Sequence, residues 1–167
     1  MGSDPDEVRS STPTRPLTVL LVEDDPSVAG ITTRWLKALN FEVIVSSDGR
    51  DALAQASRIT TPIDLLLTDV MLPRMRGPVL AGAVHRSHPE AAVLFTSGYS
   101  PELVAEISAP HTASALLLQK PFTADQLASS VAMALARKTA TSNARSAGGG
   151  GPEDPSRDAD PISADRG

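Results

Sequence analysis

Five short apolar runs alternate with five helix-like segments along the chain, and this alternation leaves few folds open. The apolar runs span 17–22, 41–45, 63–67, 91–96 and 114–119, and the helical patterns span 26–39, 49–56, 78–86, 100–107 and 123–138. Repeated units of one strand and one helix favour a parallel sheet with helices on both faces. The apolar runs are almost continuously hydrophobic, as expected of strands that are covered on both sides. The sequence therefore predicts an α/β fold with five parallel strands.

The two ends of the chain differ in composition from this middle segment. Residues 1–15 and 139–167 are rich in Ser, Thr, Pro, Gly and Asp and lack apolar periodicity, which is typical of disordered segments. Residues 148–152 read as a flexible linker with no foldable sequence after it. Hydrophobic residues make up 41% of the 167 residues, enough for one ordinary domain. We therefore expect one domain over residues 16–138, flanked by disordered tails.

Composition also argues against several classes of protein. The chain has no cysteine, so it can form neither disulfides nor thiolate metal sites. No apolar run is long enough to span a bilayer or to form the core of a signal peptide. The formal net charge is -5 and no basic cluster occurs in the sequence, which argues against binding to nucleic acid. We expect a cytoplasmic protein with neither a DNA nor a membrane partner.

Polar side chains stand at the ends of four of the predicted strands. They are Glu23, Asp24 and Asp25 after the first strand, Asp69 after the third, Ser97 after the fourth and Lys120 after the fifth. Taken singly, each has an ordinary explanation as a turn former, a helix cap or a solvated charge. Those explanations do not predict that all these residues should lie at the same edge of the sheet. The carboxyl ends of parallel strands meet at one edge of a sheet, where such folds bind ligands, so the set predicts a site there.

The residue types in this set suit phosphoryl chemistry. Neighbouring carboxylates raise one another's pKa unless a cation joins them. Carboxylate and carbonyl oxygens are preferred ligands of Mg²⁺, which commonly serves phosphate chemistry. Beside that ion, Asp69 can act as a nucleophile toward a phosphoryl group, while Lys120 and Ser97 stabilise the charge on its oxygens. We therefore predict a Mg²⁺-dependent phosphoacceptor site.

Four motifs carry a resemblance to a known family. VEDDP, DVMLPRMRG, TSGY and KPF, in this order and on these strands, resemble the receiver domain of two-component response regulators. The resemblance covers Thr18 to Arg137 and is specific as a set. It implies a flavodoxin-like, doubly wound fold with strand order 2-1-3-4-5. It also implies phosphotransfer to Asp69 from a sensor histidine kinase or a histidine phosphotransfer protein.

The resemblance also implies ligands for the metal. Glu23 and Asp24 match the acidic pair of the family, so Asp24 is expected to bind Mg²⁺ directly and Glu23 through water. Asp69 and the backbone carbonyl of Met71 are the other implied ligands. Asp25 falls outside the pair, and we interpret it as the cap of the first helix.

Further roles follow from the same motifs. Ser97 matches the Ser/Thr switch position, and Lys120 matches the lysine that contacts the phosphoryl group. The peptide bond between Lys120 and Pro121 is expected to be cis. Gly77 is expected to shape the loop after Asp69. The implied protein is a signalling module that catalyses only its own phosphorylation and dephosphorylation, and is not a turnover enzyme.

The sequence departs from the family at the switch. Many receivers carry an aromatic residue where this chain has Leu117, so the usual movement of a ring toward the site must be altered or carried by other residues. Tyr99 is one candidate for such a switch residue. An equal alternative is that Tyr99 is a loop residue that packs over the fourth strand. Met71 and Tyr99 flank the site, and an apolar pair there predicts slow dephosphorylation because it limits the approach of water.

Other classes were weighed against this interpretation. A haloacid-dehalogenase-type phosphatase needs a second acid two residues after its nucleophile, where this chain has Met71. A flavodoxin needs a phosphate loop after the first strand, where this chain has the acidic VEDDP, and its aromatic content is only 3%. A pseudo-receiver that binds partners without being phosphorylated remains as the alternative.

The sequence says less about how the protein passes its signal on. Only linker-like sequence follows Lys138, so we expect a stand-alone receiver, a monomer or weak dimer that binds a protein, relays phosphate or drains it. TSGY and GPVLAGAVHR also resemble receivers of hybrid histidine kinases. Trp35 on the first helix belongs either to a kinase-docking face or to the core. His85 and His88 are interpreted as surface cations near a helix end.

Overall fold

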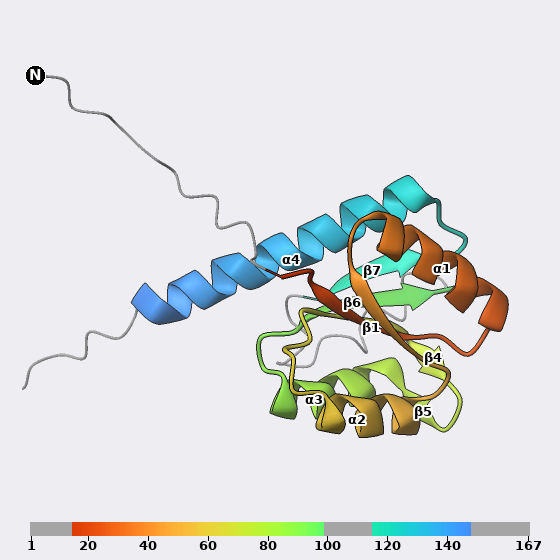
Figure 1. Ribbon diagram of the computed structural model, residues 1–167, viewed down its shortest axis with the longest axis horizontal. Helices are drawn as coiled ribbons and strands as arrows, with labels where there is room; N and C mark the ends of the chain where they lie inside the picture. The colour runs from red at the N-terminus through yellow and green to blue at the C-terminus, as the bar shows by residue number, and fades with distance from the viewer. Residues whose placement is uncertain (1–14, 99–114, 148–167) are drawn as a thin grey trace, which may run out of the picture.

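The computed structural model describes residues 15–98 and 115–147, which form a parallel β-sheet with helices on both faces (Figure 1). The sheet consists of β1 (Thr18–Val22), β2 (Glu42–Ser46), β3 (Leu65–Asp69), β6 (Ala92–Ser97) and β7 (Leu116–Gln119). All four pairings are parallel, and the strand order is β2-β1-β3-β6-β7. This order confirms the predicted 2-1-3-4-5 arrangement and the doubly wound fold.

The helices cover the sheet in two pairs. Helix α1 (Pro26–Ala38) and helix α4 (Ala124–Ala147) lie on one face, and α2 (Gly49–Arg58) and α3 (Gly77–Ser87) lie on the other (Figure 1). The helix predicted over residues 100–107 lies outside the described residues. No helix in the described ranges combines the length and apolar character needed to cross a bilayer.

The two faces of the sheet belong to two separate hydrophobic clusters. Leu20 and Leu66 point to the cluster under α2 and α3, whereas Leu21 and Leu67 point to the cluster under α1 and α4. All four side chains are at most 3% exposed. Alternation of side chains along a strand thus explains why the strands are apolar at every position.

Local sequence sets the ends of helix α1. Asp25 caps its start by accepting hydrogen bonds from the N–H groups of Ser27 and Val28, and Pro26 occupies the first turn. At the other end, Asn40 adopts a φ of 64°, while the N–H groups of Asn40 and Phe41 close back on the last helical turn. Asparagine tolerates this left-handed conformation, so it ends the helix in place of the usual glycine. The predicted cap role of Asp25 is confirmed.

Helix α4 is longer than the sequence predicts. A capping box between Thr123 and Gln126 opens it as expected. It then runs to Ala147, whereas the disordered tail was predicted to begin at Thr139, so that start is corrected. Residues 139–147 contain neither Gly nor Pro, so no strong helix breaker interrupts them. The end of the helix coincides with the start of the glycine run at Gly148, which disfavours helix.

A small hairpin follows β3 and was not predicted. Strand β4 (Met71–Leu72) pairs with β5 (Met75–Arg76) in antiparallel fashion. The turn between them consists of Pro73 and Arg74, and Arg74 has a φ of 65°. This hairpin carries the chain from the carboxyl end of β3 into α3, so it borders the predicted site.

Candidate functional site

The carboxyl edge of the sheet brings the predicted acidic residues and Lys120 together. Glu23 and Asp24 follow β1, Asp69 ends the adjacent strand β3, and Lys120 follows β7. The Nζ atom of Lys120 lies 2.7 Å from Oε2 of Glu23 and 2.7 Å from Oδ2 of Asp69. Residues far apart in the sequence thus meet in one cluster, as the strand-end pattern predicts.

The three carboxylates have the chemistry of a metal site. Each offers an oxygen, and the three oxygens lie within 4.8 Å of one another. Glu23 is 4% exposed, Asp69 is partly buried and Asp24 is open to solvent. Hard oxygen donors at this spacing, with one side open, fit a small divalent cation that retains some of its water. The donor set therefore fits Mg²⁺.

Lys120 is charged and held in place by its partners. Burial of the ammonium is the largest single influence on the pKa of Lys120 and acts to lower it. Hydrogen bonds and charge attraction from Asp69 and Glu23 together outweigh burial, so the pKa of Lys120 lies above its usual value. The lysine is therefore a fixed positive charge beside the Asp69 carboxylate.

The backbone around Asp69 fixes its side chain. Its Oδ1 accepts a hydrogen bond from the N–H of Met71 at 3.0 Å, while Lys120 binds Oδ2. The next peptide is fixed by two bonds, because the N–H of Val70 donates to Thr96 and the N–H of Gly77 donates to Val70. Both carboxylate oxygens of Asp69 thus have a donor, and the loop that follows is tied to the sheet.

Gly77 is required by a close backbone approach. A Cβ atom at this position would collide with the carbonyl oxygen of Asp69 and would lie 3.1 Å from the Cα atom of Val70. Only glycine lets the hairpin return this near to the end of β3. The structure thus gives a steric reason for the loop-shaping role predicted for Gly77.

The other predicted site residues lie on β6 and β7. Ser97 ends β6, is 1% exposed and accepts a backbone hydrogen bond from the N–H of Lys120. The Lys120–Pro121 peptide is cis, as predicted. Leu117 lies on β7 and packs against the cluster under α2 and α3. Tyr99 lies outside the described residues.

Trp35 on α1 is partly buried. It packs against the cluster under α1 and α4, and its ring meets Phe122 edge to face with centroids 6.3 Å apart. The structure thus shows that Trp35 packs against the core, while part of its side chain stays exposed on α1. Phe122 immediately follows the cis proline, so this contact ties α1 to the segment that carries Lys120.

Sequence reasoning missed a charged cluster at the opposite edge of the sheet. Asp64 is 5% exposed and accepts a hydrogen bond from the N–H of Thr18 at 2.9 Å. Its carboxylate also pairs with Arg15 at 2.9 Å and with Lys138 on α4 at 3.2 Å. Burial, the largest influence, acts to raise the pKa of Asp64, but these donors together lower it below the usual value. The cluster ties both ends of the domain to β3.

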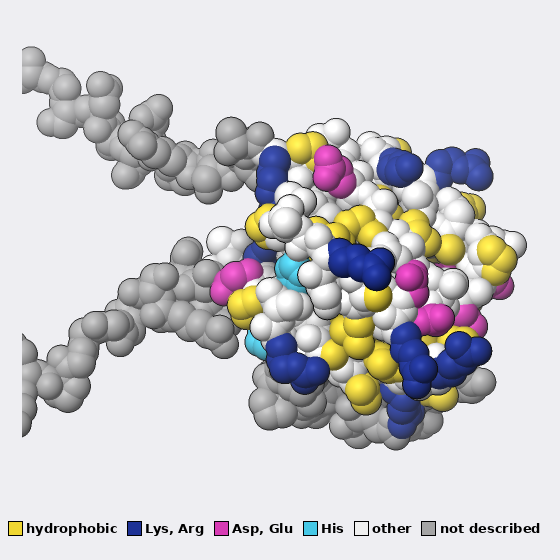
Figure 2. Space-filling model, turned by 60° about the horizontal axis from the view of Figure 1, so that its bottom comes forward, with side chains coloured by type: hydrophobic (Ala, Val, Ile, Leu, Met, Phe, Trp, Pro, Cys, Tyr) yellow, Lys and Arg dark blue, Asp and Glu magenta, His cyan; other side chains and the backbone are white. Residues whose placement is uncertain are grey.

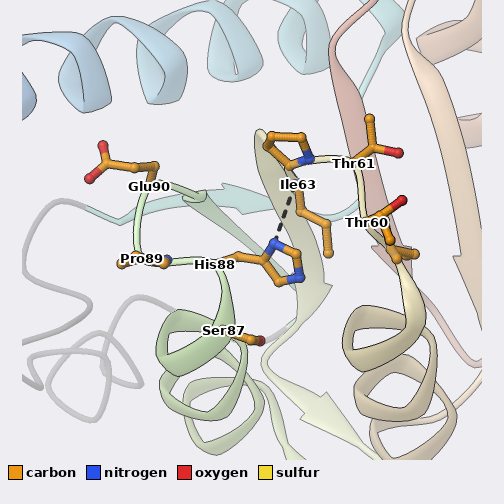
Figure 3. A pocket seen from close by; sticks show the side chains of 9 residues that line it. Thr60, Thr61, Ile63, Ser87, His88, Pro89 and Glu90 are labelled. Carbon is orange, nitrogen blue, oxygen red and sulfur yellow. Dashed lines mark hydrogen bonds between the residues drawn. The ribbon is translucent and has the colours of Figure 1, made fainter.

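His88, which was interpreted as a surface residue at a helix end, is partly buried and lines a pocket at this opposite edge (Figure 3). The pocket has a volume of about 310 Å³ and includes Thr60, Ile63 and Glu90 in its lining. The Nε2 atom of His88 lies 2.9 Å from the carbonyl of Ala56, and Nδ1 accepts a hydrogen bond from the N–H of Ile63 at 3.5 Å. Through these two contacts the ring links the end of α2 to the segment before β3.

Comparison with known proteins identifies the family. The model of the response regulator receiver domain matches residues 19–132. The chain belongs to this receiver family. Its fold is therefore the one that the resemblance of the four sequence motifs implied.

Individual relatives support the same assignment. The chain is 34% identical over 114 residues to the sensor kinase CckA of Brucella abortus, an alignment that covers 68% of this chain and 12% of the kinase. A crystal structure of the receiver domain from hybrid histidine kinase CckA matches with a TM-score of 0.59 and 32% identity, covering 71% of this chain and 98% of that one. Chemotaxis protein CheY4 of Vibrio cholerae matches with a TM-score of 0.65 and 28% identity, covering 72% and 99%. The chain thus spans a small part of the kinase but nearly all of the isolated receiver structures.

Membership in the receiver family fixes the general class of function. Receiver domains are modules of two-component signal transduction and are not turnover enzymes. They interact with histidine kinases or phosphotransfer proteins, and they generally bind Mg²⁺ at an acidic pocket such as the one formed here by Glu23, Asp24 and Asp69.

Proposed function

We propose that this receiver accepts a phosphoryl group on Asp69 from a sensor histidine kinase or a histidine phosphotransfer protein. The observation that carries the proposal is the position of the Asp69 carboxylate, which ends a central strand between the N–H of Met71 and the ammonium of Lys120. A carboxylate that serves only as a turn former has no need of a partly buried lysine that is held by a second acid.

The proposed transfer is an in-line displacement at phosphorus. One oxygen of Asp69 attacks the phosphoryl group, and an acyl phosphate bond forms. The bond between phosphorus and the donor's imidazole nitrogen breaks, and that nitrogen keeps the electron pair. Lys120 lies beside the acceptor oxygen, so its charge offsets the charge brought by the phosphoryl oxygens. Ser97, at the end of β6, is the side chain that we assign to a hydrogen bond with the transferred group.

The acidic set supports a role for Mg²⁺ in this transfer. Glu23, Asp24, Asp69 and the backbone carbonyl of Met71 would hold the ion, with Glu23 acting through water. When bound, Mg²⁺ supplies positive charge that neutralises the phosphoryl oxygens and lets three carboxylates stay ionised together. The role of the protein is to hold Asp69 still and to keep Lys120 charged.

We further propose that the receiver acts in the cytoplasm, as a monomer or weak dimer that signals by binding another protein or by phosphorelay. Its own site would also hydrolyse the acyl phosphate. Met71 lies two residues after the acceptor, its N–H binds the Asp69 carboxylate and its side chain is exposed, which supports slow hydrolysis. Leu117 is aliphatic and packs against the cluster under α2 and α3, so it has no ring that could move toward the site. This supports a switch that is carried by other residues.

A transfer assay tests the proposed acceptor. The protein is incubated with candidate histidine kinases in Mg²⁺, and phosphoryl transfer is compared in the wild type, Asp69→Asn and Asp25→Asn. Asp25→Asn is the matched control, because it removes a neighbouring charge while asparagine keeps the helix cap. We expect transfer to the wild type and to Asp25→Asn but not to Asp69→Asn. Unchanged transfer to Asp69→Asn would contradict the proposal.

A further inference from the structure

Folding creates a basic surface that the linear sequence does not reveal. Five arginines, all exposed, lie on the side of the molecule that carries α2, the β4–β5 hairpin and α3: Arg50, Arg58, Arg74, Arg76 and Arg86. Figure 2 shows Lys and Arg side chains gathered at the end of this face where Figure 1 draws β4 and β5, next to acidic side chains. This surface stands out because the whole chain has a formal net charge of -5.

The acids nearest to these arginines are already used in local structure. One oxygen of Asp48 accepts hydrogen bonds from the backbone N–H groups of Arg50 and Asp51, which cap α2. The carboxylate of Asp51 binds the hydroxyl of Ser46 and the amide of Gln55. Among the described residues, neither Arg50 nor Arg74 forms an ion pair. The pKa of Asp48 is lowered chiefly by the backbone hydrogen bond from Asp51 and also by the charges of Arg74 and Arg50. The two guanidinium groups nevertheless stay exposed and can meet a ligand.

The hairpin connects this basic surface to the acceptor. Arg76 is paired with Met71 across the hairpin, and its Nη2 atom lies 3.5 Å from Sδ of Met71. The N–H of the same Met71 donates to Oδ1 of Asp69 at 3.0 Å. Arg76 also directly precedes Gly77, whose backbone contacts the end of β3. The guanidinium of Arg76 thus lies over the loop that fixes the acceptor carboxylate, and Arg74 forms the exposed turn beside it.

The charge of the site makes such a surface useful. Glu23, Asp24 and Asp69 bring three negative charges against the single positive charge of Lys120, so the site tends to repel an incoming anion. Guanidinium groups at the edge of a site attract phosphate and raise the rate of encounter with anionic ligands.

We propose that Arg74 and Arg76 recruit the phosphodonor to Asp69 and give this site a preference for donors that carry a net charge of -2 over donors that carry a net charge of -1. This inference rests on the proposed function of Asp69 and adds the class of substrate that the site prefers. Arg74 and Arg76 are positioning residues, because they act on the approach of the donor and not on the reacting atoms.

The rate of phosphorylation by small donors tests this inference. The apparent second-order rate constant is measured with acetyl phosphate, which is a dianion at neutral pH, and with the less charged phosphoramidate, both in Mg²⁺. The double variant Arg74→Gln/Arg76→Gln is compared with the wild type. The matched control is Arg58→Gln/Arg86→Gln, which removes the same charge from the far ends of α2 and α3.

We expect the hairpin variant to be about tenfold slower than the wild type with acetyl phosphate at low ionic strength. The difference should shrink to less than about twofold near 1 M salt, where charges are screened within a few ångströms. Phosphoramidate should be affected less than acetyl phosphate, and the control variant should stay close to the wild type. A merely structural role for the arginines would produce neither the salt dependence nor the donor dependence.

Two results would overturn the inference. One is an equal loss of rate in the hairpin and control variants, and the other is a loss in the hairpin variant that persists at high salt. These outcomes are distinct from failure of the proposed function, which would appear as a wild type that no donor phosphorylates. In the hairpin variant the final extent of labelling should equal that of the wild type, whereas Asp69→Asn should remain unlabelled.

Discussion

The ammonium nitrogen of Lys120 lies 2.7 Å from Oδ2 of Asp69, although 51 residues separate the two in the sequence. The same nitrogen lies 2.7 Å from Oε2 of Glu23. The lysine therefore joins the end of β7 to the ends of β1 and β3, and it neutralises part of a dense negative charge. This relationship contributes both to the chemistry of the site and to the stability of the fold.

Substitution of Lys120 by Met should lower the free energy of unfolding near neutral pH, because Asp69 and Glu23 lose their shared cation. The raised pKa of Lys120 sets the pH range of this effect. A raised pKa means that the stabilisation is fully present below the unfolded value, near 10.5, and is lost as the pH rises through the higher folded value. Urea unfolding at neutral and strongly alkaline pH should show a difference between wild type and variant that shrinks at high pH. A constant difference would argue against the ion pair.

Gly77→Ala should destabilise the protein by about 1–3 kcal/mol, because the new Cβ overlaps the Asp69 carbonyl and the hairpin must move. The same displacement should slow phosphorylation of Asp69. Gly30→Ala is the matched control, since nothing lies within 4 Å of its Cβ and the residue is exposed in α1. That control should stabilise the protein by about 0.5–1 kcal/mol. Thermal unfolding of both variants decides the point, and a neutral Gly77→Ala would show that the approach is not tight.

Asp64→Asn should cost about 1–3 kcal/mol at neutral pH, because the buried carboxylate loses its ion pairs with Arg15 and Lys138. The pKa of Asp64 is lowered, so its stabilisation is present above the unfolded value of 3.8 and is lost as the pH falls through the folded value. Denaturant unfolding should therefore show wild type and variant converging in acid. Phosphorylation of Asp69, at the opposite edge of the sheet, should be unaffected; a large loss of phosphorylation would mean that the two edges are coupled.

Much of the fold follows from the sequence because its signals are local. Apolar runs of four to six residues, caps such as Asp25 and the helical spacing of Leu127 and Val131 each report on their own neighbourhood. The hairpin of Met71–Leu72 and Met75–Arg76 escaped prediction because two-residue strands are too short to show alternation.

The site was predictable for a different reason, since strand-end residues of a parallel sheet share one edge. That rule places Glu23, Asp69 and Lys120 together without any knowledge of their contacts. It says nothing about Asp64, which stands before its strand and whose partners lie 46 and 74 residues away. It also does not reveal the hydrogen bonds of His88, which depend on backbone groups from two other segments.

Met71→Ala should shorten the lifetime of phosphorylated Asp69 severalfold. The Met71 side chain is 46% exposed next to the acceptor, so its loss opens a path for water to the acyl phosphate. The decay of labelled protein after removal of the donor measures this rate. In the wild type we expect a lifetime well beyond seconds. A lifetime of seconds in the wild type, or no change in the variant, would contradict a protective role for Met71.

Chemical mapping of the phosphorylated residue tests the central claim most directly. The protein is phosphorylated with acetyl phosphate in Mg²⁺ and treated with borohydride, which reduces an aspartyl phosphate to homoserine. Peptide mass spectrometry then locates the converted residue. We predict conversion at Asp69 and at no other acid of the cluster, whereas conversion at Asp24 or Asp25, or no conversion at all, would contradict the assignment.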